Sequence, residues 1–363
     1  MSRREYLDWL RGVAVLVMIE AHTYDAWTRV DERADTAYRW AIVLGGFAAP
    51  GFLFLAGITL ALAAGGRLRR GLPAPVVTAA AARWGWKVFG FAFLFRLQSW
   101  LISGGAFPRA LFKVDILNVM GLGMVAAAGL WGLGRTRAQR IALLAGATAA
   151  VSLAAPLVRS AGWVAALPPP VGWYLAPVAG WSTFSLAPWV GFLFAGAALG
   201  LLLDAVSGPD DERRLMGRLA VAGPALAVAS FAGSMLPSMY ASSSFWTTSP
   251  SFFFLRLGLL LGALPVAYRW TARHTGWSPV RELGVASFFV YWVHVELVYG
   301  VLTLPIHKAL GFEAATAAYA VFVALTFGLV RLKQRLAGSW AVFRQEPAQP
   351  QAQAPSLGRL ETS

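Results

Sequence analysis

Long apolar runs, separated by short charged or Pro-rich breaks, dominate the chain. Most of them approach the roughly 20 residues that a helix needs to cross a bilayer. Backbone N–H and C=O groups inside lipid must bond within their own segment, so the pattern predicts helices throughout. We expect an all-α polytopic membrane protein with about ten transmembrane helices around a central cavity. The predicted spans are Tyr6–Tyr24, Trp40–Ala64, Val76–Ser103, Val114–Leu133, Ile141–Val158, Phe184–Ala205, Leu215–Leu236, Phe252–Trp270, Leu283–Leu304 and Ala314–Leu332.

The cations between these runs follow an alternating pattern. The N-terminus and every second loop after it are rich in Arg, as in Arg67, Arg69 and Arg70, whereas the loops between them hold few uncompensated cations. Loops rich in Lys and Arg face the cytoplasm in membrane proteins. The pattern therefore predicts that both termini are cytoplasmic, in the inner membrane of a bacterium. The uncharged loop Pro237–Pro250 then faces outward.

Composition supports a membrane protein and excludes a soluble one. Hydrophobic residues make up 58% of the chain and charged residues only 13%, whereas a soluble domain carries about 25% charged residues. The net charge of +14 is explained by cytoplasmic loops, so we expect the lipid bilayer and not nucleic acid as a partner. Cys is absent, which excludes disulfides and thiolate chemistry, and we expect no metal site.

The chain is predicted to form one domain with a tail. No second soluble domain interrupts the apolar runs, so residues 1–343 form the membrane domain. The stretch Glu346–Pro355 is rich in Pro, Gln and Ala and lacks the apolar residues needed to pack a core. We therefore expect residues 344–363 to be a disordered cytoplasmic tail.

The first predicted helix carries the most informative charges. An ionisable residue inside a membrane span is costly, so each one is a candidate functional residue. Arg11 and His22 are eleven residues apart, close to three helical turns, which places them on one face about 16 Å apart along the axis. Asp8 lies one turn before Arg11. A cation and a histidine on one face, at different depths, suit a long substrate that crosses the membrane. The same residues equally fit a structural interpretation, in which Asp8 and Arg11 form an ion pair at the helix start and His22 lies at the membrane interface.

Four segments along the chain together form a pattern. The first reads Leu7-Asp-Trp-Leu-Arg-Gly12 and is followed by an apolar stretch and His22. The others are Phe47–Gly57, Val114–Gly121 and Leu283–His294. In this order they resemble segments of the transmembrane acyltransferases, which include heparan-alpha-glucosaminide N-acetyltransferase and the bacterial enzymes that O-acetylate glycans. The third helix reads Arg83-Trp-Gly-Trp-Lys87 where the glycan enzymes carry Arg-x-x-Arg. The resemblance is thus nearer to a separate bacterial branch than to either well-known group.

The resemblance implies transfer of an acyl group, most simply acetyl, from a coenzyme A thioester to a hydroxyl or amine of a sugar or glycan. Such a transfer needs a base, and neutral imidazole serves because its pKa lies near 6.5. We assign this role to His22, with a transient acyl-imidazole on the same ring as the alternative. Asp25 or Asp115 would support the ring. Asp115 equally fits a helix N-cap or an ion pair with Lys113. His294, in a late span, is the alternative base, but it equally fits a buried histidine that is bonded to a backbone carbonyl.

The donor would be a cytoplasmic co-substrate, and we expect no bound cofactor. Coenzyme A is polyanionic, and Arg offers forked hydrogen bonds to phosphate. Arg11, Arg83 and Lys87 are therefore predicted to bind the donor, and Asn118 and His294 to contact a substrate. Arg83 and Lys87 equally fit cationic side chains that reach the lipid headgroups.

A transporter or flippase for an anionic or sugar-containing substrate is the main rival function, because it would also use intramembrane Arg, His and Asp. Transporters often contain internal repeats with broken helices in matching positions. We find no such repeat between the two halves of this sequence. A non-catalytic scaffold would not need charges in so many spans. The sequence does not name the acceptor.

Overall fold

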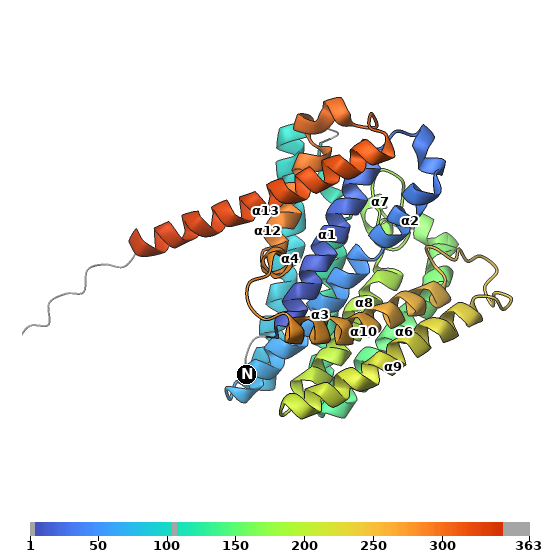
Figure 1. The fold of residues 1–363 in the computed structure, drawn as a ribbon. Helices are drawn as coiled ribbons and strands as arrows, with labels where there is room; N and C mark the ends of the chain where they lie inside the picture. Colours follow the sequence, from blue (N-terminus) through green and yellow to red (C-terminus); the bar gives the residue numbers. More distant parts are fainter. Residues whose placement is uncertain (1–3, 104–106, 344–363) are drawn as a thin grey trace, which may run out of the picture.

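The computed structural model describes residues 4–103 and 107–343, and within them the fold is helical apart from two isolated β-bridges (Figure 1). The tail predicted at 344–363 lies outside the described residues. The α-helices are α1 Glu5–Trp27, α2 Thr36–Gly45, α3 Ala48–Arg69, α4 Ala74–Ser103, α5 Ile116–Leu133, α6 Arg137–Arg159, α7 Pro169–Gly172, α8 Leu186–Asp204, α9 Pro209–Gly233, α10 Pro250–Arg273, α11 Pro279–Val285, α12 Ser287–Tyr299 and α13 Phe312–Phe343. The 3-10 helices are η1 Asp31–Ala34, η2 Arg109–Phe112, η3 Gly162–Ala166 and η4 Val301–Ile306.

Among the described residues, 7 helical segments are long and apolar enough to cross a membrane, so the protein is polytopic but the predicted count of ten is not confirmed. The segment that contains α2 and α3 counts as one of them. The seven are Thr36–Arg69, Ile116–Leu133, Arg137–Arg159, Leu186–Asp204, Pro209–Gly233, Pro250–Arg273 and Phe312–Ala337.

The three predicted spans outside this set are the ones with charges or breaks. Helices α1 and α4 are 23 and 30 residues long, but charged side chains interrupt their apolar surfaces. The predicted span Leu283–Leu304 is not one helix. It breaks at Ala286 and again at Gly300, which leaves α12 with only 13 residues. These three segments supply most of the candidate site residues.

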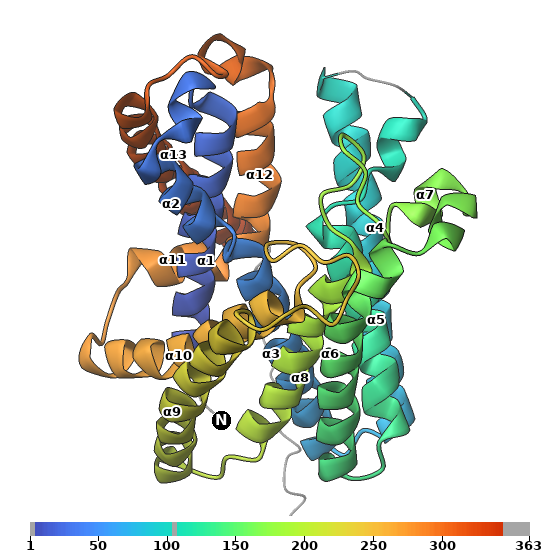
Figure 2. The same cartoon turned by 90° about the vertical axis from the view of Figure 1, so that its right-hand side faces the viewer.

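Close glycine contacts hold α3 against α8 in the middle of the molecule (Figure 2). A Cβ atom added at Gly57 would lie 2.0 Å from the carbonyl oxygen of Leu193, and one at Gly196 would lie 1.9 Å from that of Phe54. Only glycine permits this approach of two backbones, which is the way that small residues pack helices in membranes. In Figure 2, α1, α2 and α10–α13 lie on one side of this pair, and α4 and α5 lie on the other.

Ion pairs join several helix ends at one end of the bundle. Arg4, just before α1, pairs with Glu212 of α9 at 2.7 Å, and Tyr6 donates to the same carboxylate. Arg69, at the end of α3, pairs with Asp204, the last residue of α8, at 2.5 Å. The end of α1 lies at the other end of the molecule, where Thr28 pairs with Leu310. The ion pairs thus bring together the N-terminus, the end of α3 and the turn between α8 and α9.

Candidate active site

Helix α12 is fixed against α1 at both of its ends. Before it, α11 crosses α1 so closely that a Cβ at Gly284 would lie 1.8 Å from the carbonyl oxygen of Asp8. After it, the indole of Trp27 donates to the carbonyl of Val298 over 3.2 Å. Between these anchors, Val290, His294 and Val298 recur every fourth residue and are fully buried. This spacing is one helical face, and it turns His294 toward α1.

His22 of α1 and His294 of α12 form the centre of the site. Nδ1 of His22 lies 2.8 Å from Nε2 of His294. The two rings are nearly parallel, with centroids 5.1 Å apart and an interplanar angle of 12°. The other ring nitrogen of His294, Nδ1, lies 2.9 Å from the carbonyl oxygen of Val290. The sequence prediction singled out both histidines, and the structure brings them together.

The hydrogen bonds of this pair determine where the protons lie. The Val290 carbonyl can only accept, so Nδ1 of His294 carries a hydrogen. In the neutral ring Nε2 of His294 is then an acceptor, and Nδ1 of His22 must donate to it. A neutral His22 consequently has its lone pair on Nε2, for which no hydrogen bond is present among the described residues. The pair thus presents a base at Nε2 of His22.

Asp25 lies near His22, but its carboxylate is bound to other groups. It accepts a hydrogen bond of 3.0 Å from the hydroxyl of Tyr299, and it pairs with Arg33 at 3.6 Å. The ring of Tyr299 packs edge-on against His22, with centroids 5.7 Å apart. The group bonded to Nδ1 of His22 is therefore His294, and Asp25 reaches the imidazole through Tyr299.

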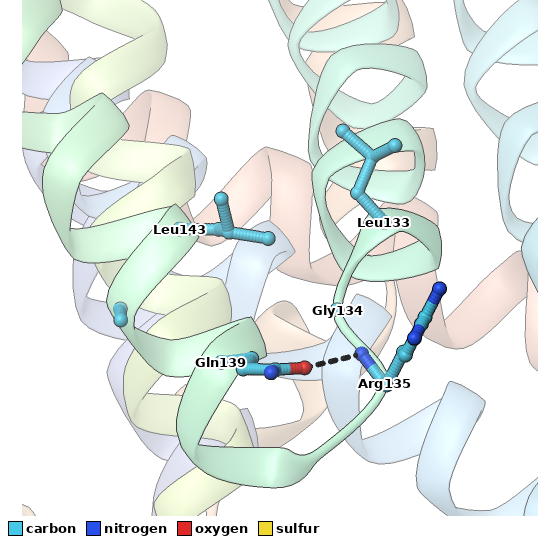
Figure 3. A pocket seen from close by; sticks show the side chains of 6 residues that line it. Leu133, Gly134, Arg135, Gln139 and Leu143 are labelled. Carbon is cyan, nitrogen blue, oxygen red and sulfur yellow. Dashed lines mark hydrogen bonds between the residues drawn. The ribbon is translucent and has the colours of Figure 1, made fainter.

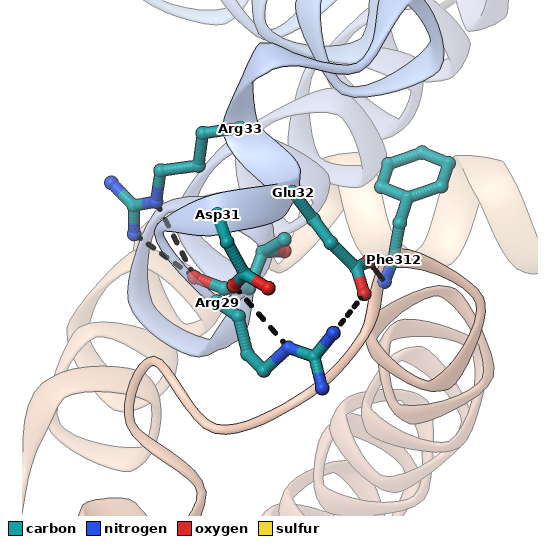
Figure 4. Close-up of polar contacts among 6 residues, drawn as sticks. Arg29, Asp31, Glu32, Arg33 and Phe312 are labelled. Carbon is teal, nitrogen blue, oxygen red and sulfur yellow. Dashed lines mark hydrogen bonds and ion pairs between the residues drawn. The ribbon is translucent and has the colours of Figure 1, made fainter.

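Polar contacts hold the loop after α1 and tie it to the start of α13 (Figure 4). Arg29 pairs with Asp31 at 3.4 Å and with Glu32 at 2.6 Å. Glu32 also accepts a hydrogen bond from the backbone N–H of Phe312, which ties the loop to the first turn of α13. Arg33 donates to the carbonyl of Thr28 over 3.3 Å. These contacts tie the loop to the end of α1 and to α13.

Asp115 and Asn118 form a helix cap rather than a contact to His22. Asp115 is the N-cap of α5, and its carboxylate accepts from the backbone N–H groups of Leu117 and Asn118 at 2.9 and 3.3 Å. Its ion-pair partner is Arg96 of α4, at 3.1 Å, in place of the Lys113 that the sequence suggested. The amide of Asn118 donates to the hydroxyl of Tyr174 over 3.1 Å.

Tyr174 stands outside the membrane helices, in the segment after α7. Burial raises the pKa of Tyr174 to about 12, with the charge of Asp115 acting in the same direction and the hydrogen bond from Asn118 opposing it. The phenol therefore stays neutral near pH 7 and can accept from Asn118. This network connects α5 with the segment before α8 and stabilises the end of the bundle at which Asp115 lies.

The three cations assigned to the donor lie in two different places. Arg11 is half-buried on α1 and pairs with Asp8 at 3.1 Å. Arg83 and Lys87 are exposed on α4. Gly85, between them, packs against the backbone of α5, so both cations point away from α5. The main packing partner of α4 is α5, not α1.

A surface pocket lies at the turn between α5 and α6 and includes none of the candidate site residues (Figure 3). Leu133, Gly134, Arg135, Gln139, Ala142 and Leu143 line it at the turn between α5 and α6. Gln139 accepts from the backbone N–H of Arg135 over 2.9 Å, as part of the cap of α6. Since Asp115 caps the other end of α5, this pocket is separated from that end by the whole length of the helix.

Arg256 of α10 is a candidate functional residue that the sequence prediction missed. It is a cation inside the predicted span Phe252–Trp270, and that is the signal that marks functional residues in membrane proteins. Tyr299, which links Asp25 to the His22 ring, was missed as well. No sequence pattern indicates Tyr299, because its contacts come from residues more than 270 positions away.

Comparisons with known proteins add one family. A model of the catalytic region of heparan-alpha-glucosaminide N-acetyltransferase matches residues 3–224, which is more than half of the chain. The match includes α1 with Arg11, His22 and Asp25, whereas His294 and Arg256 lie beyond it. No curated protein matches the chain.

Proposed function

Because the chain belongs to the family of the heparan-alpha-glucosaminide N-acetyltransferase catalytic domain, and is thus a membrane-bound acyltransferase, we propose that it moves an acetyl group from a cytoplasmic coenzyme A thioester to an acceptor at the outer face. The acceptor is a hydroxyl or amine of a sugar or glycan. The observation that carries this proposal is the His22–His294 pair. Its hydrogen bonds leave Nε2 of His22 unprotonated. His22 lies on α1, within the region that matches the family.

The proposed reaction uses Nε2 of His22 as the general base. It takes the proton of the acceptor hydroxyl or amine while the acceptor atom attacks the thioester carbonyl carbon. The carbon–sulfur bond then breaks, and the protonated His22 returns its proton to the departing thiolate. His294 does not react in this scheme, since it only holds the His22 ring in the required tautomer. Asp25 and Tyr299 support the ring from the outer side.

The simplest test uses purified protein with acetyl-CoA and glucosamine as donor and acceptor probes. Release of free thiol reports turnover of the donor, and acetylated sugar reports transfer. Acetyl-CoA left intact, or hydrolysed with no acetylated sugar across a panel of amine and hydroxyl sugars, would contradict the proposed transfer. A transporter would leave the donor unchanged, so the same assay separates the two functions.

The proposed direction of transfer requires a cytoplasmic N-terminus. Fusions of a reporter at residue 343 and near Ser243 are expected to report opposite sides, with residue 343 in the cytoplasm, because Arg-rich loops stay inside. Alkaline phosphatase and green fluorescent protein activities measure this. A fusion near Ser243 that fluoresces in the cytoplasm would contradict the proposed orientation.

Arg11→Ala is expected to weaken acetyl-CoA binding roughly 10-fold, because a charged hydrogen bond to a phosphate would be lost. Calorimetry on purified protein measures the dissociation constant, and Arg83→Ala tests the second predicted cation in parallel. Arg70→Ala is the matched control, since Arg70 is an exposed cation at the end of α3. Equal dissociation constants for Arg11→Ala and Arg70→Ala would remove Arg11 from the donor site.

A further inference from the structure

Aromatic rings surround the side chain of Arg256. Its guanidinium carbon lies 3.9 Å from the ring centroid of Phe252, 5.8 Å from that of Phe47 and 5.9 Å from that of Trp189. These rings come from α10, the α2–α3 turn and α8. Cation–π attraction to them offsets part of the cost of keeping the charge in apolar surroundings. Attraction to the ring faces does not supply a hydrogen-bond acceptor for the N–H groups at the guanidinium edge.

Two N–H donors in this cluster are buried and lack an acceptor. Nε of Arg256 and Nε1 of Trp189 have no hydrogen-bond partner within the described part of the chain. No carboxylate in that part forms an ion pair with Arg256 either. A buried donor without a partner costs about 1–3 kcal/mol, and native structures rarely contain one. The cluster therefore holds two unsatisfied donors beside one cation.

The cluster lies beside the part of α1 that carries His22. A Cβ added at Gly46, in the turn between α2 and α3, would lie 3.0 Å from Nη2 of Arg256. One added at the preceding Gly45 would lie 2.6 Å from Cβ of Ala21, the residue before His22. A Cβ at Gly45 would also lie 3.4 Å from Oε2 of Glu20. This carboxylate oxygen is buried and, within the described part of the chain, has neither a hydrogen-bond partner nor an ion pair with Arg256.

We propose that Arg256 and Trp189 bind an oxyanion of the acceptor, a carboxylate or a phosphate ester, next to the catalytic histidine. This inference rests on the proposed acyl transfer and names the class of its acceptor as acidic. Phe252 covers the face of the guanidinium, so the free edge favours two parallel hydrogen bonds to one anion. The indole N–H of Trp189 supplies a third donor.

The same chemistry would also recognise a phosphate of the donor, so the two sources have to be separated. The proposed reaction places the phosphates of coenzyme A at the cytoplasmic end of α1, near Arg11. Arg256 instead lies by the turn that contacts Ala21, ten residues further along α1. At 1.5 Å per residue this is about 15 Å along the helix axis. The acceptor is therefore the substrate that reaches Arg256.

The test compares glucuronate with glucose, a neutral sugar that has the same ring. Full-length purified wild-type protein is expected to bind glucuronate more tightly than glucose, as measured by fluorescence titration and by the shift in Tm. Arg256→Gln should weaken glucuronate binding roughly 10-fold or more. Arg256→Lys keeps the positive charge but loses the paired N–H donors of the guanidinium, so its affinity for glucuronate should lie between those of wild type and Arg256→Gln. Trp189→Phe loses one donor and should also have an intermediate affinity. Arg39→Gln, on the exposed surface of α2, removes the same charge and should change nothing.

Binding of glucuronate does not require turnover, so this test is independent of the catalytic one. Unchanged glucuronate affinity in Arg256→Gln, or no binding of glucuronate to the wild type, would overturn the acidic-acceptor site. A weaker acetyl-CoA affinity with unchanged glucuronate affinity would assign Arg256 to the donor and also overturn it. If Arg256→Gln does not fold, the affinities of Arg256→Lys and Trp189→Phe for glucuronate and for acetyl-CoA test the acidic-acceptor site in the same way.

Discussion

His22→Gln is expected to lower the rate of acyl transfer by roughly 10²–10⁴-fold, which is the usual contribution of a general base. The glutamine amide can still donate to Nε2 of His294, at 2.8 Å from Nδ1 of His22 in the native protein. It cannot take a proton from the acceptor near pH 7. The kcat of purified protein with acetyl-CoA and glucosamine measures the loss, while calorimetry should give a nearly unchanged dissociation constant for acetyl-CoA.

The comparison with His22→Ala separates catalysis from structure. A catalytic His22 predicts that both variants fold and that both are nearly inactive. A structural His22 predicts the opposite order, with Gln tolerated and Ala giving less folded protein. Asp25→Asn is a second control. It should cause a smaller loss, because Asp25 reaches the imidazole only through Tyr299. Full activity of well-folded His22→Gln would contradict His22 as the general base, and His294 would then be the candidate.

His294→Leu is expected to lower kcat roughly 10²-fold, because the acceptor that fixes the tautomer of His22 would be removed. Without it, Nδ1 of His22 has no buried partner, and the ring is free to rotate or to carry its hydrogen on Nε2. The lone pair would then no longer face the acceptor. Steady-state kinetics should show the effect in kcat, with the KM for acetyl-CoA little changed.

His294→Gln is the matched variant for this role. The glutamine side chain places a carbonyl oxygen near the position of Nε2, so it can accept from His22 and should restore much of the activity. A purely structural role predicts no such rescue, since His294 is 0% exposed and both substitutions disturb the same packing. Equal kcat values for folded His294→Leu and wild-type protein would exclude the positioning role.

The sequence determined the features that depend on short stretches of chain. Apolar run length identified an all-α membrane protein, and the first helix with its Arg11–His22 spacing identified the acyltransferase family, which the match over residues 3–224 confirms. The Asp115 and Asn118 capping box is equally local, because its hydrogen bonds span only three residues. Such features can be read from sequence because neighbouring residues alone determine them.

Tertiary structure decided which residues meet. His22 and His294 are 272 positions apart, and their contact depends on the close crossing of α1 and α11 at Gly284, which no local periodicity encodes. The same holds for the pairing of Asp115 with Arg96 and for the aromatic cluster around Arg256. The helix breaks near Ala286 and Gly300 were also not predicted, because they lie within the apolar run Leu283–Leu304. Hydropathy averages over a window, whereas a break or a contact depends on how separate helices pack against each other.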